Sequence, residues 1–310
     1  MEQQKYRLVT RSDFDGLVCA VLLNELGMID DIRFVHPKDM QDGKVEITGR
    51  DITTNLPYVK DAHMVFDHHL SETIRNVGER MNHVIDPNAP SAARVVYDHF
   101  GGREKFPDIS QEMMEAVDKA DSGQFTLDEI LSPKGWVLLN YLMDSRTGLG
   151  RFREFKVSNY ALMMDLIRYC KDHTIEEILE LPDLKERVRL YFDHAERAKE
   201  QIKRCSTVHD NLVVLDLRFE ETIWATNRFM IYALFPQVNI SIHLMWGLQK
   251  QNTVFAVGKS ILNRASKTNI GELMLRYNGG GHPAAGTCQI ENDKADAVLQ
   301  ELIRKINADG

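Results

Sequence analysis

The sequence predicts an α/β protein with an N-terminal parallel sheet flanked by helices, a helical connector and a smaller C-terminal α/β domain. Two observations support this fold class. Short apolar strand patterns alternate with helix patterns over residues 6–99, which is typical of a parallel sheet whose strands are joined by helices. A mostly helical stretch over residues 110–205 then separates these elements from a second group of strand patterns.

The N-terminal elements follow one another in a regular order. Strands are expected over residues 6–10, 31–35, 45–48 and 63–66, and helices over residues 17–26 and 91–99. Gly27 ends the first helix and Pro90 precedes the second, as expected at helix boundaries. Ligands of such sheets bind beyond the carboxyl ends of the strands, so polar residues that follow these strands are the candidates for a functional site.

The C-terminal elements begin with a long helix. Residues 185–204 are rich in Glu, Lys and Arg, with apolar residues at helical spacing, and this pattern predicts a connecting helix. Strands are expected over residues 211–217, 239–245 and 253–257. A chain of 310 residues is long enough for two domains with separate cores. The expected division is a first domain over 1–157, a connector over 158–207 and a second domain over 208–310.

The composition excludes several classes of protein. A hydrophobic content of 43% and a charged content of 27% are typical of a soluble globular protein. No apolar run is long enough to cross a bilayer, and the N-terminus does not resemble a signal peptide. The net charge of −8 argues against a protein that coats long nucleic acid. Because the four cysteines form no Cys-x-x-Cys pair, we expect a reducing, cytoplasmic environment.

Three acidic segments follow predicted strands. They are Asp13-Phe14-Asp15-Gly16, the single residue Asp51, and Asp67-His68-His69. Carboxylates and imidazoles that meet at the carboxyl edge of a sheet can hold hard divalent metal ions over a phosphate. The three segments together therefore predict one metal site, although an aspartate before a helix can also be an ordinary N-cap.

A second cluster lies near the C-terminus. It reads Asn278-Gly279-Gly280-Gly281-His282, followed by Pro283-Ala284-Ala285-Gly286. Consecutive glycines leave backbone N–H groups open to the close approach of a phosphate or a base. His282 can donate a hydrogen bond to a phosphate oxygen. We therefore interpret this segment as a ligand-binding loop.

Taken in order, these segments resemble the motifs of the DHH phosphoesterase superfamily. Residues 13–16, Asp51, residues 67–69 and Asp121-Ser122-Gly123-Gln124-Phe125 match its four motifs, and residues 279–286 resemble the signature of the companion DHHA1 domain. The resemblance covers most of the chain. The layout is similar to that of nanoRNase-type oligoribonucleotidases and of cyclic-dinucleotide or linear-dinucleotide phosphodiesterases.

The resemblance implies a role for each matching residue. The implied metal ligands, for two Mn²⁺ or Mg²⁺ ions, are Asp13, Asp15, Asp51, His68 and Asp121, with Asp51 bridging the ions. The implied catalytic residues are His69 and Asp51, with His69 near the scissile phosphate. The implied substrate-binding residues are His69, Arg264, Gly279, Gly280, Gly281 and His282. Carboxylate ligands suit either ion, and the imidazole favours Mn²⁺.

Two of these assignments have competitors. Asp118 competes with Asp121 for the last ligand position, because both lie on one short helical stretch. Many relatives carry a histidine at the position that Val9 occupies, and valine does not bind a metal. The implied site then either binds its first ion more weakly or uses another residue, for which His36 is a candidate.

The arginines and the lysine near the implied site could either contact the substrate or lie on the surface. For Arg264 and Lys259, a contact with a substrate phosphate and a solvated surface position are about equally supported by the sequence. For Arg94, which follows Pro90 on a predicted helix, exposure is the simpler explanation.

The function implied by the resemblance is that of a metal-dependent phosphodiesterase. It would hydrolyse short oligoribonucleotides or linear dinucleotides, such as pGpG or pApA, to mononucleotides. An exopolyphosphatase-type phosphoanhydride hydrolase and a non-catalytic nucleotide sensor are the alternatives. The sequence leaves open the preferred nucleotide, the cleavage of cyclic dinucleotides and the formation of a homodimer.

Overall fold

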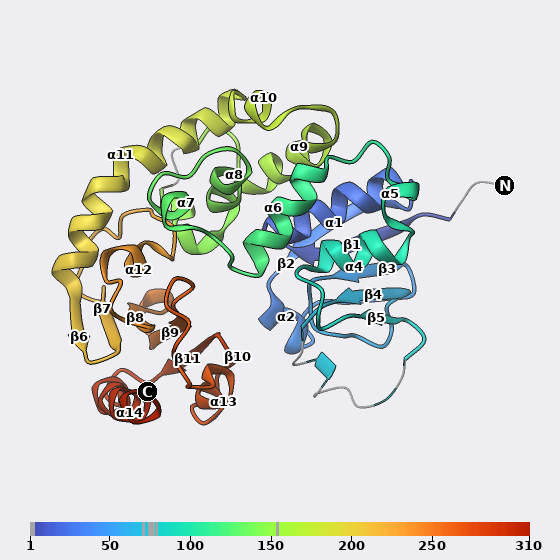
Figure 1. Ribbon diagram of the computed structural model, residues 1–310. Helices are drawn as coiled ribbons and strands as arrows, with labels where there is room; N and C mark the ends of the chain where they lie inside the picture. The colour runs from blue at the N-terminus through green and yellow to red at the C-terminus, as the bar shows by residue number, and fades with distance from the viewer. Residues whose placement is uncertain (1–3, 70–71, 74–77, 79, 153–154) are drawn as a thin grey trace. The chain divides into compact units, whose positions relative to one another are not determined.

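The computed structural model describes residues 4–69, 72–73, 78, 80–152 and 155–310 (Figure 1). The chain forms two compact units. The first comprises Met1–Gln124 and Pro133–Leu190, and the second comprises Phe125–Ser132 and Tyr191–Gly310. In the described part of the chain, no helix has both the length and the apolar character required to span a membrane.

The first unit is built on a parallel sheet of five strands. These are β1 (Tyr6–Arg11), β2 (Ile29–Val35), β3 (Asp51–Thr54), β4 (Met64–Asp67) and β5 (His83–Ile85). Their order in the sheet is β2-β1-β3-β4-β5, and every neighbouring pair is parallel. The predicted fold class is therefore confirmed for this unit, and all five carboxyl ends lie at one edge of the sheet.

Helix α1 (Phe14–Glu25) is the central helix of this unit. All ten residues of its first part are buried, from Phe14 to Leu23. It packs against α4 (Ala92–His99), α6 (Gln111–Asp121) and α9 (Asn159–Asp172). A separate apolar cluster consists of Val9, Met40, Ile47, Leu56, Ala62 and Val65, and includes a residue of α2 (Pro37–Gln41). This buried helix begins at Phe14, shortly after β1 ends at Arg11.

The other helices of the first unit are α5 (Gly102–Lys105), α8 (Gly135–Met143) and α10 (Ile175–Leu179), with 3-10 turns η1 (Ser145–Thr147) and η2 (Leu149–Arg151). The expected connecting helix is α11 (Pro182–Cys205), which passes from the first unit into the second. The structure therefore differs from the expected division, because α11 is shared rather than part of a separate connector.

Helix α7 (Leu127–Leu131) belongs to the second unit although it lies early in the sequence. The buried side chain of Asn227 donates a hydrogen bond of 2.9 Å to the carbonyl oxygen of Ile130. The rings of Phe125 and Phe229 lie 5.5 Å apart. These contacts attach residues 125–132 to the second unit, and such long-range packing is not visible in the local sequence pattern.

The second unit contains a mixed sheet of six strands. They are β6 (Ser206–His209), β7 (Leu212–Asp216), β8 (Ile240–Trp246), β9 (Thr253–Lys259), β10 (Gly280–His282) and β11 (Ala285–Ile290), in the order β10-β11-β9-β8-β7-β6. Only the β7–β8 pair is parallel. The helices are α12 (Met230–Leu234), α13 (Ile270–Leu275) and α14 (Ala295–Asp309), with the 3-10 turn η3 (Leu248–Lys250).

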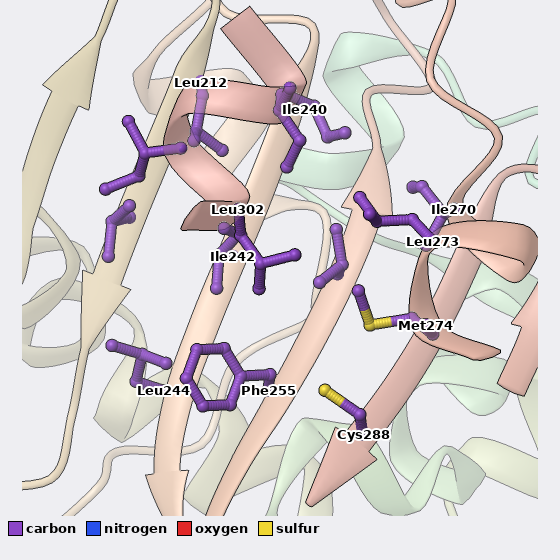
Figure 2. Packing of buried hydrophobic residues seen from close by; sticks show 14 of the residues in the cluster. Leu212, Ile240, Ile242, Leu244, Phe255, Ile270, Leu273, Met274, Cys288 and Leu302 are labelled. Carbon is purple, nitrogen blue, oxygen red and sulfur yellow. The ribbon is translucent and has the colours of Figure 1, made fainter. Parts of the chain in front are cut away.

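One face of this second sheet carries the core of the unit. Alternate residues of β8, including Ile242 and Leu244, pack with Met274 of α13 and Leu302 of α14, as Figure 2 shows. Alternation along a strand puts every second side chain on the same face. The apolar pattern that predicted these strands is therefore the pattern of their buried face.

One predicted element of the first unit is wrong. Residues 45–48 form no strand, and β3 begins only at Asp51. The backbone N–H and the hydroxyl of Thr48 both donate to a carboxylate oxygen of Asp51, at 2.7 and 3.1 Å. This local hydrogen bonding turns the chain just before the strand. Asp51 is therefore the first residue of a strand, whereas the sequence pattern places it beyond the end of one.

Candidate metal centre

Asp15, His68 and Asp121 form the one cluster of three potential metal ligands that lies within the described residues. One ligand atom of each residue lies within 4.8 Å of the other two. Asp15 is in the first turn of α1, His68 follows β4, and Asp121 is the last residue of α6. Two carboxylates and one imidazole at the carboxyl edge of the sheet suit a divalent ion of the Mn²⁺ or Mg²⁺ kind.

Asp15 is held by the backbone of a neighbouring helix. Its two oxygens accept hydrogen bonds of 3.0 and 2.8 Å from the N–H groups of Ala92 and Ala93, in the first turn of α4. The side chain is 3% exposed. Burial, and then the nearby Asp121 carboxylate, raise the pKa of Asp15 to about 7. The site thus holds more negative charge than the protein neutralises, and a bound cation would remove this penalty.

His68 is oriented for binding a metal through one ring nitrogen. Its Nδ1 lies 3.2 Å from the carbonyl oxygen of Ala89, and because a carbonyl only accepts, Nδ1 carries the hydrogen. Nε2 is buried and has no well-directed hydrogen bond, although an oxygen of Asp121 lies only 2.9 Å away. Metal-binding histidines commonly donate their other N–H to a carbonyl in this way. The residues present therefore fit a metal ion.

His68 and Asp121 also stabilise each other's charged forms. Burial disfavours the charged imidazole, yet the Asp121 carboxylate raises the pKa of His68 to about 10. Burial likewise disfavours the carboxylate, but His68 lowers the pKa of Asp121. Each residue holds the other in its charged form, and a divalent ion would take over the role of the proton.

Asp67 positions His69 rather than joining the ligand group. It is fully buried, and its Oδ1 accepts from Nδ1 of His69 at 2.6 Å and from the backbone N–H of His68 at 2.8 Å. Burial lowers the pKa of His69, but the Asp67 carboxylate more than offsets this and raises it. His69 can therefore be protonated near neutral pH and donate a hydrogen bond to a phosphate oxygen.

Asp13 lies close to the ligand group but outside it. It is the N-cap of α1 and accepts a 3.0 Å hydrogen bond from the N–H of Gly16. Its Oδ1 also accepts from Asn55 Nδ2 at 3.3 Å, and its Oδ2 lies 2.9 Å from Nε of Arg11. A Cβ at Gly16 would lie 2.0 Å from the carbonyl oxygen of Arg11, so this tight turn requires glycine.

Asp51 lies at the opposite edge of the sheet, and its expected roles as bridging ligand and catalytic residue are corrected here. It pairs in register with Arg7 at the start of β1, and Arg7 Nε lies 2.6 Å from its Oδ1. Thr54, at the carboxyl end of β3, is three residues further along the strand, a distance of roughly 10 Å at about 3.3 Å per residue. Arg7 already neutralises Asp51, so this carboxylate is a structural ion pair.

The contacts of Arg94 bear on the competition between Asp118 and Asp121. Asp118 accepts hydrogen bonds from Nε and Nη2 of Arg94, at 2.9 and 2.5 Å, and from the hydroxyl of Ser91 at 2.7 Å. Its oxygens are therefore occupied in joining α6 to α4. The geometry favours Asp121 as the ligand and explains Arg94 as a structural partner.

The candidates raised by the missing motif-one histidine lie elsewhere. Val9 is fully buried in the apolar cluster that includes Met40. His36 is exposed and caps α2 by accepting a 3.2 Å hydrogen bond from the N–H of Lys38. Neither residue belongs to the ligand group.

Three polar residues near the group were not among those predicted from the sequence. Asn55 follows β3 and is 2% exposed, and Arg11 ends β1. Arg146 is held by Asp144, whose Oδ1 lies 2.7 Å from its Nε. The ends of β1 and β3 could have indicated the first two residues, had β3 been placed correctly.

The glycine loop forms a short hairpin in the second unit. β10 pairs with β11, and a Cβ at Gly279 or Gly281 would lie 2.2 Å from a backbone oxygen. Gly281 also adopts a φ of +153°, which disfavours other residues. A Cβ at Gly280 would meet nothing within 4 Å. Two of the three glycines are thus required by packing, whereas a side chain at Gly280 would meet no other atom.

The two predicted cations of this unit lie at the end of β9 and on the loop that follows it. The backbone N–H of Lys259, the last residue of β9, donates to the carbonyl of Ala284 at 2.8 Å, next to the hairpin. Lys259 Nζ donates to the carbonyl of Ser266 at 3.0 Å, whereas the exposed Arg264 donates from Nε to the carbonyl of Ile261 at 3.3 Å. Of the two, Arg264 is the more accessible to a ligand.

The fold and the site together define a class of protein. A five-stranded parallel sheet with an Asp-x-Asp turn, an Asp-His-His segment and a further aspartate at its carboxyl edge, followed by a unit with a Gly-Gly-Gly-His hairpin, is the arrangement of the DHH/DHHA1 phosphoesterases.

Comparison with solved structures assigns the chain to this superfamily. It is 66% identical to the pGpG-specific phosphodiesterase PggH from Vibrio cholerae, with a TM-score of 0.83, covering 99% of this chain and 100% of that one. The chain therefore belongs to the DHH/DHHA1 phosphoesterase superfamily. RecJ from Thermus thermophilus in complex with Mn²⁺ shares the fold, with 12% identity and a TM-score of 0.56, over 98% of this chain and 52% of RecJ. Neither a family profile nor a curated protein sequence matched the chain.

Proposed function

We propose that this protein is a divalent-metal-dependent phosphodiesterase that hydrolyses short linear dinucleotides, foremost pGpG, to mononucleotides. The observation that carries the proposal is the Asp15-His68-Asp121 group in a chain that is 66% identical, over its full length, to a pGpG-specific phosphodiesterase. An intact ligand group with a positioned histidine beside it favours an enzyme over a nucleotide sensor, which has no need of it.

The chemistry expected at the site follows from the donors. A bound divalent ion would polarise the phosphate and lower the pKa of a water molecule. Asp15, His68 and Asp121 would hold that ion, and the N–H groups of Ala92 and Ala93 keep the Asp15 carboxylate in place. His69, fixed by Asp67, would donate a hydrogen bond to the phosphate.

The second unit would bind the part of the nucleotide away from the scissile phosphate. The hairpin leaves room beside Gly280, His282 lies on the same hairpin, and Arg264 lies on the loop that follows β9. Backbone N–H groups and a charged guanidinium are suitable donors for a phosphate or a base edge.

The proposed activity is tested with the purified chain, stripped of metal with EDTA and reloaded with Mn²⁺ or Mg²⁺. Release of mononucleotides from pGpG, pApA, cyclic di-GMP and longer RNA is followed by chromatography, and release of phosphate from polyphosphate is measured in parallel. We expect pGpG to be cleaved fastest and no turnover without metal. Faster hydrolysis of polyphosphate than of any dinucleotide, or full activity in excess EDTA, would reject the proposal.

The substrate-binding role of the second unit needs a separate test. His282→Ala and Arg264→Ala are expected to raise KM for pGpG by about 10- to 100-fold, the effect of losing a charge-assisted hydrogen bond. Hydrolysis of bis-p-nitrophenyl phosphate, which lacks a second nucleoside, should change little. Equal losses on both substrates would instead assign these residues to the chemical step.

A further inference from the structure

The end of β3 bears directly on the number of metal ions. The implied two-ion site needs a bridging carboxylate beside Asp13, but Asp51 lies at the other edge of the sheet. The residue beside Asp13 is Asn55, whose Nδ2 donates to Asp13 Oδ1 at 3.3 Å. Because a carboxylate only accepts, the amide must turn its NH₂ group toward Asp13. A buried NH₂ group at this point repels a cation.

Arg11 is a second residue that contacts Asp13. It ends β1, and its Nε lies 2.9 Å from Asp13 Oδ2. Both oxygens of Asp13 are therefore engaged, Oδ1 by Gly16 and Asn55 and Oδ2 by Arg11. A guanidinium keeps its positive charge at every physiological pH. With one third of its side chain exposed, Arg11 can meet a ligand while it holds Asp13.

The charges around Asp15 and the charges around Asp13 balance separately. With a divalent ion bound, the carboxylates of Asp15 and Asp121 would match its two positive charges, and His68 would be a neutral ligand through Nε2. Asp13 carries one negative charge, which Arg11 matches. A second divalent ion next to Asp13 would have to displace Arg11, and Asp13 belongs to no group of three potential ligands among the residues that the structure describes.

We infer that the chain binds one divalent metal ion, at Asp15, His68 and Asp121, and that Arg11 takes the place of a second ion and contacts a non-bridging oxygen of the substrate phosphate. The count of ions does not depend on the proposed function, whereas the phosphate contact rests on it.

The count is tested on the metal-free full-length chain. Mn²⁺ is added by equilibrium dialysis, protein-bound manganese is measured by mass spectrometry, and the electron paramagnetic resonance spectrum is recorded with and without a phosphorothioate analogue of pGpG. We expect one ion per chain and the spectrum of an isolated ion in both cases. Two ions per chain, or the spectrum of an exchange-coupled pair in either case, would overturn the inference. Asp121→Asn should lose the ion.

Substitutions at the two positions test what excludes the second ion. Asn55 has a φ of +54°, which aspartate tolerates nearly as well as asparagine, so Asn55→Asp should fold. The double variant Arg11→His with Asn55→Asp should raise the count from one to two. A count that remains at one would contradict the claim that these residues keep a second ion out.

The phosphate contact is tested through turnover of pGpG. Arg11→Ala should keep one ion per chain but lower kcat/KM by about 10- to 100-fold. Arg11→Lys, which keeps the charge but not the planar fork, should recover only part of this loss and guards against a folding defect. Arg33→Ala, an exposed arginine on the neighbouring β2, is the matched control and should behave as the wild type. Wild-type turnover of Arg11→Ala would remove Arg11 from the site.

Discussion

The two edges of the first sheet each carry a buried aspartate, yet only one of them fits a metal. Asp15, at the carboxyl edge, is 3% exposed, and Asp51, at the amino edge, is 1% exposed. Asp15 is held by backbone N–H groups and faces a second carboxylate, whereas Asp51 faces the guanidinium of Arg7. A buried carboxylate is thus a candidate metal ligand where its charge is left uncompensated, and a structural element where a cation already pairs with it.

The largest effect expected from this comparison is at the carboxyl edge. Asp121→Asn removes one charge from the ligand group and should abolish Mn²⁺ binding. Since a metal ion stabilises the transition state by several kcal/mol, turnover of pGpG should fall by about a thousandfold or more. Manganese content and kcat are measured on the same sample. Normal manganese content with normal turnover would show that the group is not the metal site.

A smaller loss is expected from Asp67→Asn, because Asp67 acts through His69. Turnover should fall by about 10- to 100-fold, as is usual for residues that orient a site, while manganese content stays at the wild-type value. Since the Asp67 carboxylate raises the pKa of His69, its loss lowers that pKa. The alkaline decline of kcat should therefore begin at a lower pH. An unchanged pH profile would indicate that His69 does not act as a donor.

The pH dependence of metal binding should separate the two edges further. The folded-state pKa of Asp15 is about 7, above the ordinary value of 3.8. Protonated Asp15 therefore stabilises the metal-free fold fully below about pH 4. This stability is lost as the pH rises through about 7. The metal requires ionised Asp15 and neutral His68, whose pKa is about 10. Because both groups then lose a proton, Mn²⁺ affinity should rise about a hundredfold per pH unit between pH 5 and about pH 7, and about tenfold per unit above pH 7.

Calorimetric titration with Mn²⁺ at several pH values, in two buffers of different ionisation enthalpy, measures this slope and the released protons. The melting temperature of the Mn²⁺-loaded protein should exceed that of the metal-free protein by a margin that grows with pH. A rise of only about tenfold per unit below pH 7 would mean that Asp15 is already ionised without the metal.

The smallest effect on activity is expected at the amino edge. Asp51→Asn weakens the pair with Arg7 and should cost about 1.5–3 kcal/mol of stability, the range for hydrogen bonds to charged groups. The free energy of unfolding is measured by urea denaturation. Manganese content and turnover of pGpG should stay at wild-type values, and a loss of bound manganese would return Asp51 to the ligand set.

The sequence by itself determined the features whose partners are near in the chain. The Asp13–Gly16 turn follows β1, and the Asp67-His68-His69 segment begins at the last residue of β4. The end of a strand can be predicted from the apolar residues of that strand alone. The same holds for α1 and for the alternating strands of the second unit, whose apolar residues face one core.

Only the tertiary structure decided the features that depend on strand pairing and on distant partners. Pairing with β1 places Asp51 opposite Arg7 and Asn55 beside Asp13, and Arg94 engages Asp118 and so leaves Asp121 for the ligand group. A shift in where a strand begins carries a residue to the other edge of the sheet, and the short apolar run at residues 45–48 does not fix that start. The number of metal ions depends on these contacts, because each carboxylate is paired or left unpaired by distant residues: the partner of Asp51 is 44 residues away, and the backbone partners of Asp15 are 77 and 78 residues away.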